Sequence, residues 1–179
     1  MKTFLLSIAT LFLSGLYAQT YHPVNNGSSI KFFIKNSGMD TEGKFSGLEG
    51  NIQFNPADLK NSGFSVSIEA GSVNTDIDIR DNKLREAEYL DVQKYPHISV
   101  VSKQITLLNA TGSYLAKATV TIKGNSKEVS FPFAVSYKGD GILLTGQFRI
   151  SRQDFKIGLG SLVLSDNLTI VLSVFAQKR

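Results

Sequence analysis

Hydrophobic and polar residues alternate with a period of two through most of the chain. Two segments, 45–54 and 97–108, are less regular but also contain strand-forming residues. Successive side chains of a strand point to opposite faces, so this alternation predicts about eight half-buried β-strands. The clearest rows of apolar residues at every second position fall at 30–34, 64–68, 116–122, 129–135, 144–150 and 168–176.

Clusters of turn-forming residues separate these segments. Asn, Gly, Ser and Asp, which favour tight turns, gather at 25–27, 61–63, 109–112, 123–125 and 138–141. Short turns between consecutive strands produce antiparallel hairpins. The sequence therefore predicts a meander of antiparallel strands in a single domain.

One segment, residues 80–90, lacks the alternation and is rich in helix formers. Leu84, Ala87 and Leu90 recur at helical spacing, and Asp81 is a residue type suited to cap a helix N-terminus. Pro96 ends this segment, because the residue before a proline favours extended backbone. We expect one short helix in an otherwise all-β chain.

Meandering strands in this number can close into a barrel, which removes exposed strand edges. We therefore predict an all-β fold: a closed antiparallel β-barrel of about eight strands with one short helix. A barrel embedded in a membrane would carry an apolar band on its outer face. The positions opposite the apolar rows instead include Lys31, Lys117 and Arg149, so a soluble barrel with an apolar interior fits better.

The interior of such a barrel is either filled by its own side chains or holds one small ligand. Ala116 and Ala118 are small and would leave space, unless rings such as Phe64 and Phe148 reach over and fill it. The pattern alone leaves both alternatives open. The residues that we expect to line an apolar ligand pocket are Phe32, Phe45, Phe64, Ile68, Ala116, Ala118, Val120, Phe131, Phe133, Phe148, Ile170 and Leu172.

The composition of the 179 residues narrows the chemistry further. Hydrophobic residues make up 42% and charged residues 19%, which is enough apolar material for a core. The absence of cysteine and the presence of only two histidines exclude disulfides, thiolate metal sites and an all-histidine metal triad. The net charge of +4 comes from scattered Lys and Arg residues, so we expect no nucleic-acid partner. We predict neither a metal ion nor a cofactor.

The N-terminus has the layout of a secretory signal peptide. Lys2 precedes an apolar run at 4–16, and Ala18 offers a small residue for cleavage. The run is shorter than the roughly 20 residues of a membrane-spanning helix, so we expect no transmembrane anchoring. We assign residues 1–18 to a cleaved signal peptide and residues 19–179 to the barrel domain, in the periplasm or secreted.

Four polar residues near the ends of predicted elements are candidates for a polar mouth of the pocket. They are Arg80, His97, Arg152 and Asp154. Arg152 offers fork-like binding of a carboxylate or phosphate, and pairing with Asp154 at the rim is the alternative. The chain has no nucleophile elbow and no phosphate-binding glycine loop, and we predict no catalytic residue.

Several short motifs occur in a fixed order along the chain. They are FSGLEGNIQF at 45–54, NT at 74–75, RD at 80–81, YLD at 89–91, YPHI at 95–98, VTIKG at 120–124 and ISRQDF at 150–155. Together they resemble the YceI-like family of exported lipid- and polyisoprenoid-binding proteins. The resemblance implies a lipocalin-like barrel around a long apolar tunnel. Lys156 departs from the family, which usually has glycine there.

Three functions fit these observations. The first is a carrier that holds a polyisoprenoid, an isoprenoid quinone or a fatty-acid-like lipid for transport, storage or sequestration. The second is an enzyme on a small apolar substrate, with His97 or Asp154 as its acid or base. The third is a filled barrel that serves as a structural or stress module. We expect the carrier, with an isoprenoid or acyl-chain lipid as its partner, and leave the lipid and a homodimer open.

Overall fold

The computed structural model describes residues 19–109 and 112–178. The predicted signal peptide lies outside these residues. None of the helices in the described ranges is long and apolar enough to cross a membrane. The strands are β1 (Gln19–Pro23), β2 (Ser29–Asn36), β3 (Met39–Phe45), β4 (Glu49–Phe54), β5 (Gly63–Glu69), β6 (His97–Asn109), β7 (Ser113–Ile122), β8 (Asn125–Lys138), β9 (Gly141–Ser151) and β10 (Leu164–Lys178). The helices are η1 (Leu59–Asn61), η2 (Ala70–Ser72), α1 (Asp78–Arg85) and η3 (Arg152–Phe155).

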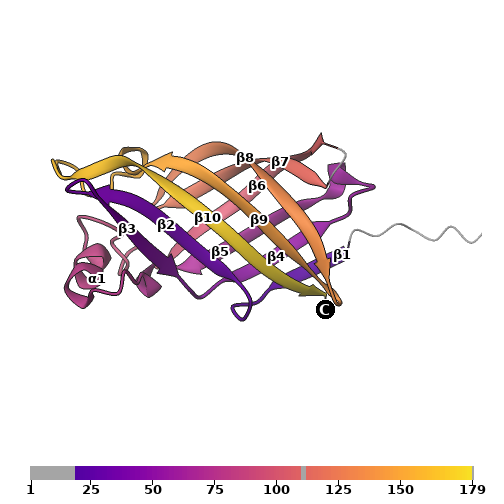
Figure 1. Cartoon of the computed structure of the whole chain (residues 1–179), viewed down its shortest axis with the longest axis horizontal. Coiled ribbons are helices and arrows are strands. Elements are labelled where there is room, and N and C mark those ends of the chain that lie inside the picture. The colour runs from indigo at the N-terminus through magenta and orange to yellow at the C-terminus, as the bar shows by residue number, and fades with distance from the viewer. Residues whose placement is uncertain (1–18, 110–111, 179) are drawn as a thin grey trace, which may run out of the picture.

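A closed barrel forms from β1 and from β4 to β10, with every neighbouring pair antiparallel. The long strand β10 closes it, because its C-terminal end pairs with β1 and the rest of the strand pairs with β2. Strand β3 extends this sheet beyond β2. The predicted closed antiparallel barrel with one α-helix is confirmed. Figure 1 shows the tilted strands that form its wall.

The alternation of hydrophobic and polar residues did not predict two of the strands. The first is β1, and the second is β3, whose last residue, Phe45, was expected to begin one strand with β4 over 45–54. The chain breaks between them at Gly47, whose φ of +70° is a conformation that glycine adopts at little cost. The break turns the chain from β3, which pairs with β2, into β4, which pairs with β1 and β5.

Helix α1 is shorter than the predicted segment, and its N-terminus is built differently. It spans Asp78–Arg85, with Ile77 at the N-cap position and no capping side chain. The prediction that Asp81 caps the helix is wrong, because Asp81 lies inside the first turn and is buried. Its Oδ1 accepts hydrogen bonds from the backbone N–H and the hydroxyl of Thr75, at 2.8 and 2.5 Å. Asp81 therefore ties the helix to the segment that precedes it.

The two ends of the barrel differ. One end carries α1, the β2–β3 turn and the loop between η3 and β10, and the other carries the ends of β1 and β10 (Figure 1, left and right). Aromatic rings fill the interior towards the second end: Phe54 and Tyr114 lie 5.1 Å apart, and Tyr114 and Phe133 5.5 Å apart. Burial raises the pKa of the Tyr114 hydroxyl above its ordinary value. We call this group the aromatic layer.

Candidate functional site

An apolar cavity of about 210 Å³ lies inside the barrel. It runs from the end that carries α1 to the aromatic layer, where Phe133 forms part of its wall. An apolar cavity of roughly 150 Å³ is already large enough to take up benzene. The interior is therefore filled by rings at one end and contains an apolar cavity in the remainder, which combines the two alternatives that the sequence left open.

The register of the strands explains why the cavity wall is apolar. Ile170 of β10 lies opposite Phe32 of β2 on one side and opposite Phe148 of β9 on the other. These three residues line the cavity together. Because cross-strand partners share one face of a sheet, three strands bring their apolar rows to the same interior surface.

Most of the predicted pocket residues line this cavity. Ala116 and Ala118 do not, and the expectation that they open space is corrected by the structure. Both are fully covered, at 0% and 1% exposed, and Ala116 lies opposite the ring of Phe131 in β8. The predicted residues that do form the wall are Phe32, Phe45, Phe64, Ile68, Val120, Phe131, Phe133, Phe148, Ile170 and Leu172.

Sequence reasoning missed the part of the wall that comes from the connection between β5 and β6. Thr75, Leu84, Tyr89 and Leu90 line the cavity from this segment. The helical spacing of Leu84 and Leu90 indicated an apolar face of the helix, but nothing in the pattern showed that this face covers an end of the barrel.

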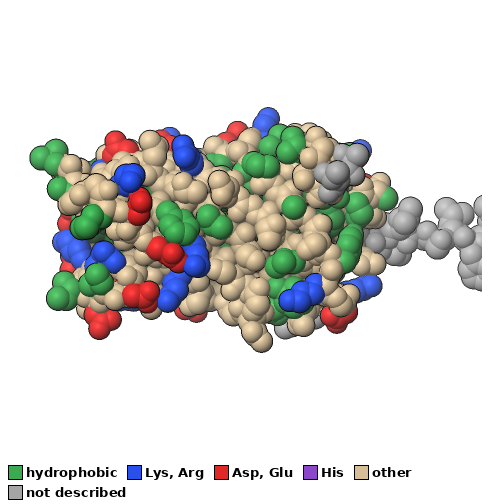
Figure 2. All heavy atoms as spheres, viewed as in Figure 1, with side chains coloured by type: hydrophobic (Ala, Val, Ile, Leu, Met, Phe, Trp, Pro, Cys, Tyr) green, Lys and Arg blue, Asp and Glu red, His purple; other side chains and the backbone are tan. Residues whose placement is uncertain are grey.

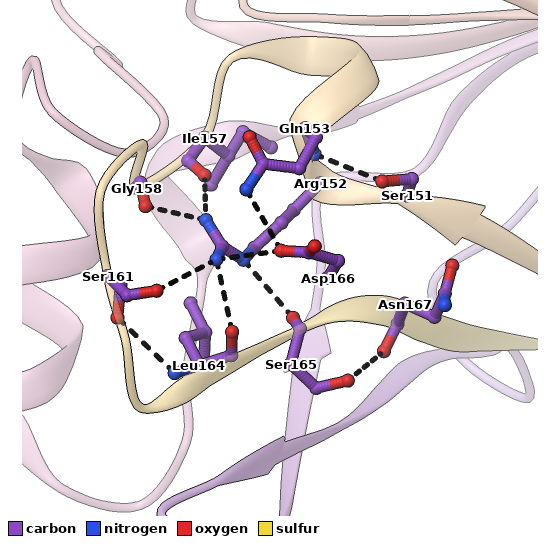
Figure 3. Close-up of polar contacts among 10 residues, drawn as sticks. All are labelled: Ser151, Arg152, Gln153, Ile157, Gly158, Ser161, Leu164, Ser165, Asp166 and Asn167. Atoms are coloured by element: carbon purple, nitrogen blue, oxygen red, sulfur yellow. Dashed lines mark hydrogen bonds and ion pairs between the residues drawn. The ribbon is translucent and has the colours of Figure 1, made fainter.

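Arg152 lines the cavity but is not free to bind a ligand. Its side chain is 2% exposed, and the guanidinium donates hydrogen bonds to the carbonyl oxygens of Ile157, Gly158, Ser161, Leu164 and Ser165. Figure 3 shows these carbonyls converging on the guanidinium from the loop between η3 and β10. An ion pair of 2.9 Å joins Nη2 to Oδ1 of Asp166. The side chain therefore holds the loop, and its acidic partner is Asp166 rather than Asp154.

Arg80 is half-buried and lines the cavity from the first turn of α1. Its Nε donates to the hydroxyl oxygen of Thr75 at 2.7 Å, and its Nη2 donates to the Thr75 carbonyl oxygen at 2.9 Å. Thr75 is itself held by hydrogen bonds to Asp81. The chain of contacts from Asp81 through Thr75 therefore sets the position of the Arg80 guanidinium.

His97 and Asp154 lie outside the cavity wall, which corrects their predicted place at its mouth. His97 is exposed at the start of β6, with its Nδ1 3.9 Å from Oε1 of Glu49. Asp154 is exposed and pairs with Lys127 at 3.3 Å. Neither side chain is placed to act on a molecule inside the barrel.

The outer surface around the cavity mouth carries charges of both signs. Figure 2 shows charged and hydrophobic side chains gathered at the end of the molecule where α1 lies. Lys35 pairs with Asp40 at 3.0 Å and Lys44 with Asp76 at 3.1 Å. These surface pairs largely cancel one another's charge.

Comparison of the sequence with known proteins identifies its family. The model of a family described as "YceI-like domain" matches residues 21–176. A UPF0312 protein of Pseudomonas putida (strain W619) is 32% identical over 101 residues, which are 55% of this chain and 50% of that protein. The chain thus spans about half the length of this relative.

Solved structures share the fold. BcnA of Burkholderia cenocepacia has a TM-score of 0.81 at 22% identity, over 87% of this chain and 99% of that one. A domain from Saccharophagus degradans, described as polyisoprenoid binding and implicated in plant cell wall breakdown, has a TM-score of 0.72 at 19% identity. That match covers 90% of this chain and 99% of that one. At these identities the likeness establishes the barrel architecture.

Proposed function

The chain belongs to the YceI-like family, and we propose from this and from its cavity that it is an exported carrier of a long apolar amphiphile. The tail of a polyisoprenoid, an isoprenoid quinone or a fatty-acid-like lipid lies among the phenylalanine and aliphatic side chains of the barrel. The head group stays at the end of the barrel that carries α1. The carrier transports, stores or sequesters its lipid.

The apolar cavity inside a closed barrel is the observation that carries this proposal. Each methylene group removed from water contributes about 0.8 kcal/mol, so a tail of ten carbons gains on the order of 8 kcal/mol before the costs of association. Such a ligand needs few polar contacts. The description of the Saccharophagus domain as polyisoprenoid binding supports a tail of this kind.

The wall of the cavity favours binding over catalysis. General acid–base chemistry needs an ionisable group near the substrate, often one with a shifted pKa. His97 and Asp154, the two candidates for an acid or base in the enzyme hypothesis, lie outside the wall. Burial raises the pKa of Tyr21, and hydrogen bonding to Lys103 lowers that of Glu128, but both residues also lie outside it.

The test blocks the cavity on β10 and adds the same bulk to the outside of the strand as a control. Leu172 lines the cavity, and its neighbour Val171 does not. We expect native mass spectrometry of the mature protein, with lipid extraction, to show a lipid adduct in the wild type and in Val171→Trp. The adduct should be lost in Leu172→Trp, because the indole occupies the space of the tail.

A wild-type protein that carries no adduct and takes up no farnesol or hexadecanol would contradict the carrier. Equal occupancy of Leu172→Trp and the wild type would contradict the assignment of the tail to this cavity.

A further inference from the structure

The charges along the cavity wall are all of one sign. The charged side chains at the cavity wall are Arg80 and Arg152, whereas no Asp, Glu or His within residues 19–109 and 112–178 lines it. Lys31 shares the outer face of the sheet with its cross-strand partner Val171. An apolar cavity with only cations at its wall favours a ligand that brings negative charge, since opposite charges stabilise each other strongly where water is scarce.

One of the two cations already has an acidic partner. Arg152 pairs with Asp166 at 2.9 Å, in addition to its five carbonyl contacts. Arg80 differs, because in the described part of the chain no carboxylate oxygen lies within 4.0 Å of its guanidinium. The nearest acidic group in this hydrogen-bond network is Asp81, which reaches Arg80 only indirectly, because the Thr75 hydroxyl lies between them.

The hydrogen bonds of Arg80 leave one edge of the guanidinium free. Thr75 occupies the edge formed by Nε and Nη2. The remaining edge, formed by Nη1 and the second N–H of Nη2, has the spacing that binds two oxygens of a carboxylate or phosphate in parallel. Because Thr75 and Asp81 already fix the side chain, little conformational entropy is lost when an anion binds there.

We propose that the amphiphile bound in the barrel has an anionic head group, a carboxylate or a phosphate, and that Arg80 binds it through its free edge. This inference rests on the proposed carrier function and adds the chemical class of the head group. A neutral alcohol of the same tail length binds through the apolar wall alone and is held less tightly.

The experiment compares tails of equal length with different heads. Hexadecanoate, hexadecyl phosphate and hexadecanol are titrated calorimetrically into the mature wild type, Arg80→Gln and Lys44→Gln. Lys44→Gln is the control, since it removes one positive charge from the same end of the barrel at a residue outside the cavity wall. A hydrogen bond to a charged group contributes enough that Arg80→Gln should weaken binding of the two anions about tenfold to a hundredfold.

Binding of hexadecanol should stay within about twofold of the wild type in both variants, which also shows that Arg80→Gln retains its fold. Lys44→Gln should leave all three affinities nearly unchanged at physiological salt, because exposed pairs are screened. The inference is overturned if Arg80→Gln weakens hexadecanol as much as the anions, or if it weakens neither. If none of the three molecules binds the wild type, the carrier function itself fails, which is a separate result.

A difference between hexadecanoate and hexadecyl phosphate in the wild type assigns the head group to one of the two anions. Equal affinities assign it to anions of either kind.

Discussion

The Arg152 guanidinium holds the loop between η3 and β10 through hydrogen bonds to its backbone. Its N–H groups satisfy five backbone carbonyls that would otherwise need water in a poorly accessible place. The ion pair adds less, because the Asp166 side chain is 56% exposed. Nearby, Lys156 has a φ of +56°, a left-handed conformation that glycine adopts at less cost than lysine.

Arg152→Ala should therefore act on stability. We expect a loss of about 3–5 kcal/mol in the free energy of unfolding, because buried partners are left without their cation. Asp166→Asn should cost less than about 1 kcal/mol. Urea denaturation of both variants measures this. If Arg152→Ala unfolds like the wild type but no longer binds hexadecanoate, then Arg152 binds the head group and its structural role is wrong.

At the scale of elements, the sequence was informative where a strand has one apolar face and uninformative where it does not. The strands with clear apolar rows, β2, β5 and β7 to β10, were predicted from their alternation, and β6 was predicted from its strand-forming residues. Strand β3 lacks it, because Gly43 stands where an inward side chain is expected. The ring of Phe32 lies over this glycine, so close that a Cβ would overlap it. The apolar group at that place thus comes from the neighbouring strand, which no pattern within β3 shows.

Strand β7 carries a pair of inward positions that separates packing from ligand binding. Ala118 is fully covered and does not line the cavity, whereas Val120, two residues along, does. Ala118→Phe should destabilise the protein by about 1–3 kcal/mol, since the added ring has no free space. Val120→Phe should cost less stability and should lower lipid occupancy more, because its ring enters the cavity.

Thermal unfolding together with native mass spectrometry of both variants checks this pair. If Ala118→Phe lost its bound lipid but kept its stability, the cavity would reach Ala118, and the assignment of Ala118 to the packed part of the interior would be wrong.

For the whole molecule, the sequence predicted a barrel and most of its apolar wall, but not how the interior is divided. That division depends on which rings meet inside the barrel: Phe54 of β4 contacts Tyr114 of β7, a strand distant along the chain, and Tyr114 pairs with Phe133 of β8. The polar part of the site was less predictable for the same reason. Arg80, Arg152, His97 and Asp154 are all ionisable residues near the ends of predicted elements. Only the fold shows that the two arginines line the cavity and that His97 and Asp154 do not.

The export of the molecule is the prediction that concerns the chain as a whole. Cleavage after Ala18 would leave Gln19 as the first residue, and Gln19 is also the first residue of β1, opposite Phe54 of β4. Because β1 joins β4 to β10, a mature chain that begins there keeps every strand needed to close the barrel.

Expression of the full sequence in a Gram-negative host should place a protein of residues 19–179 in the periplasm or the medium. Intact-mass measurement of each fraction checks this. An exported protein that retains residues 1–18, or an uncleaved protein confined to the cytoplasm, would contradict the prediction. The control replaces Phe4–Leu16 with polar residues, and it should abolish export without changing the mass of the chain's barrel domain.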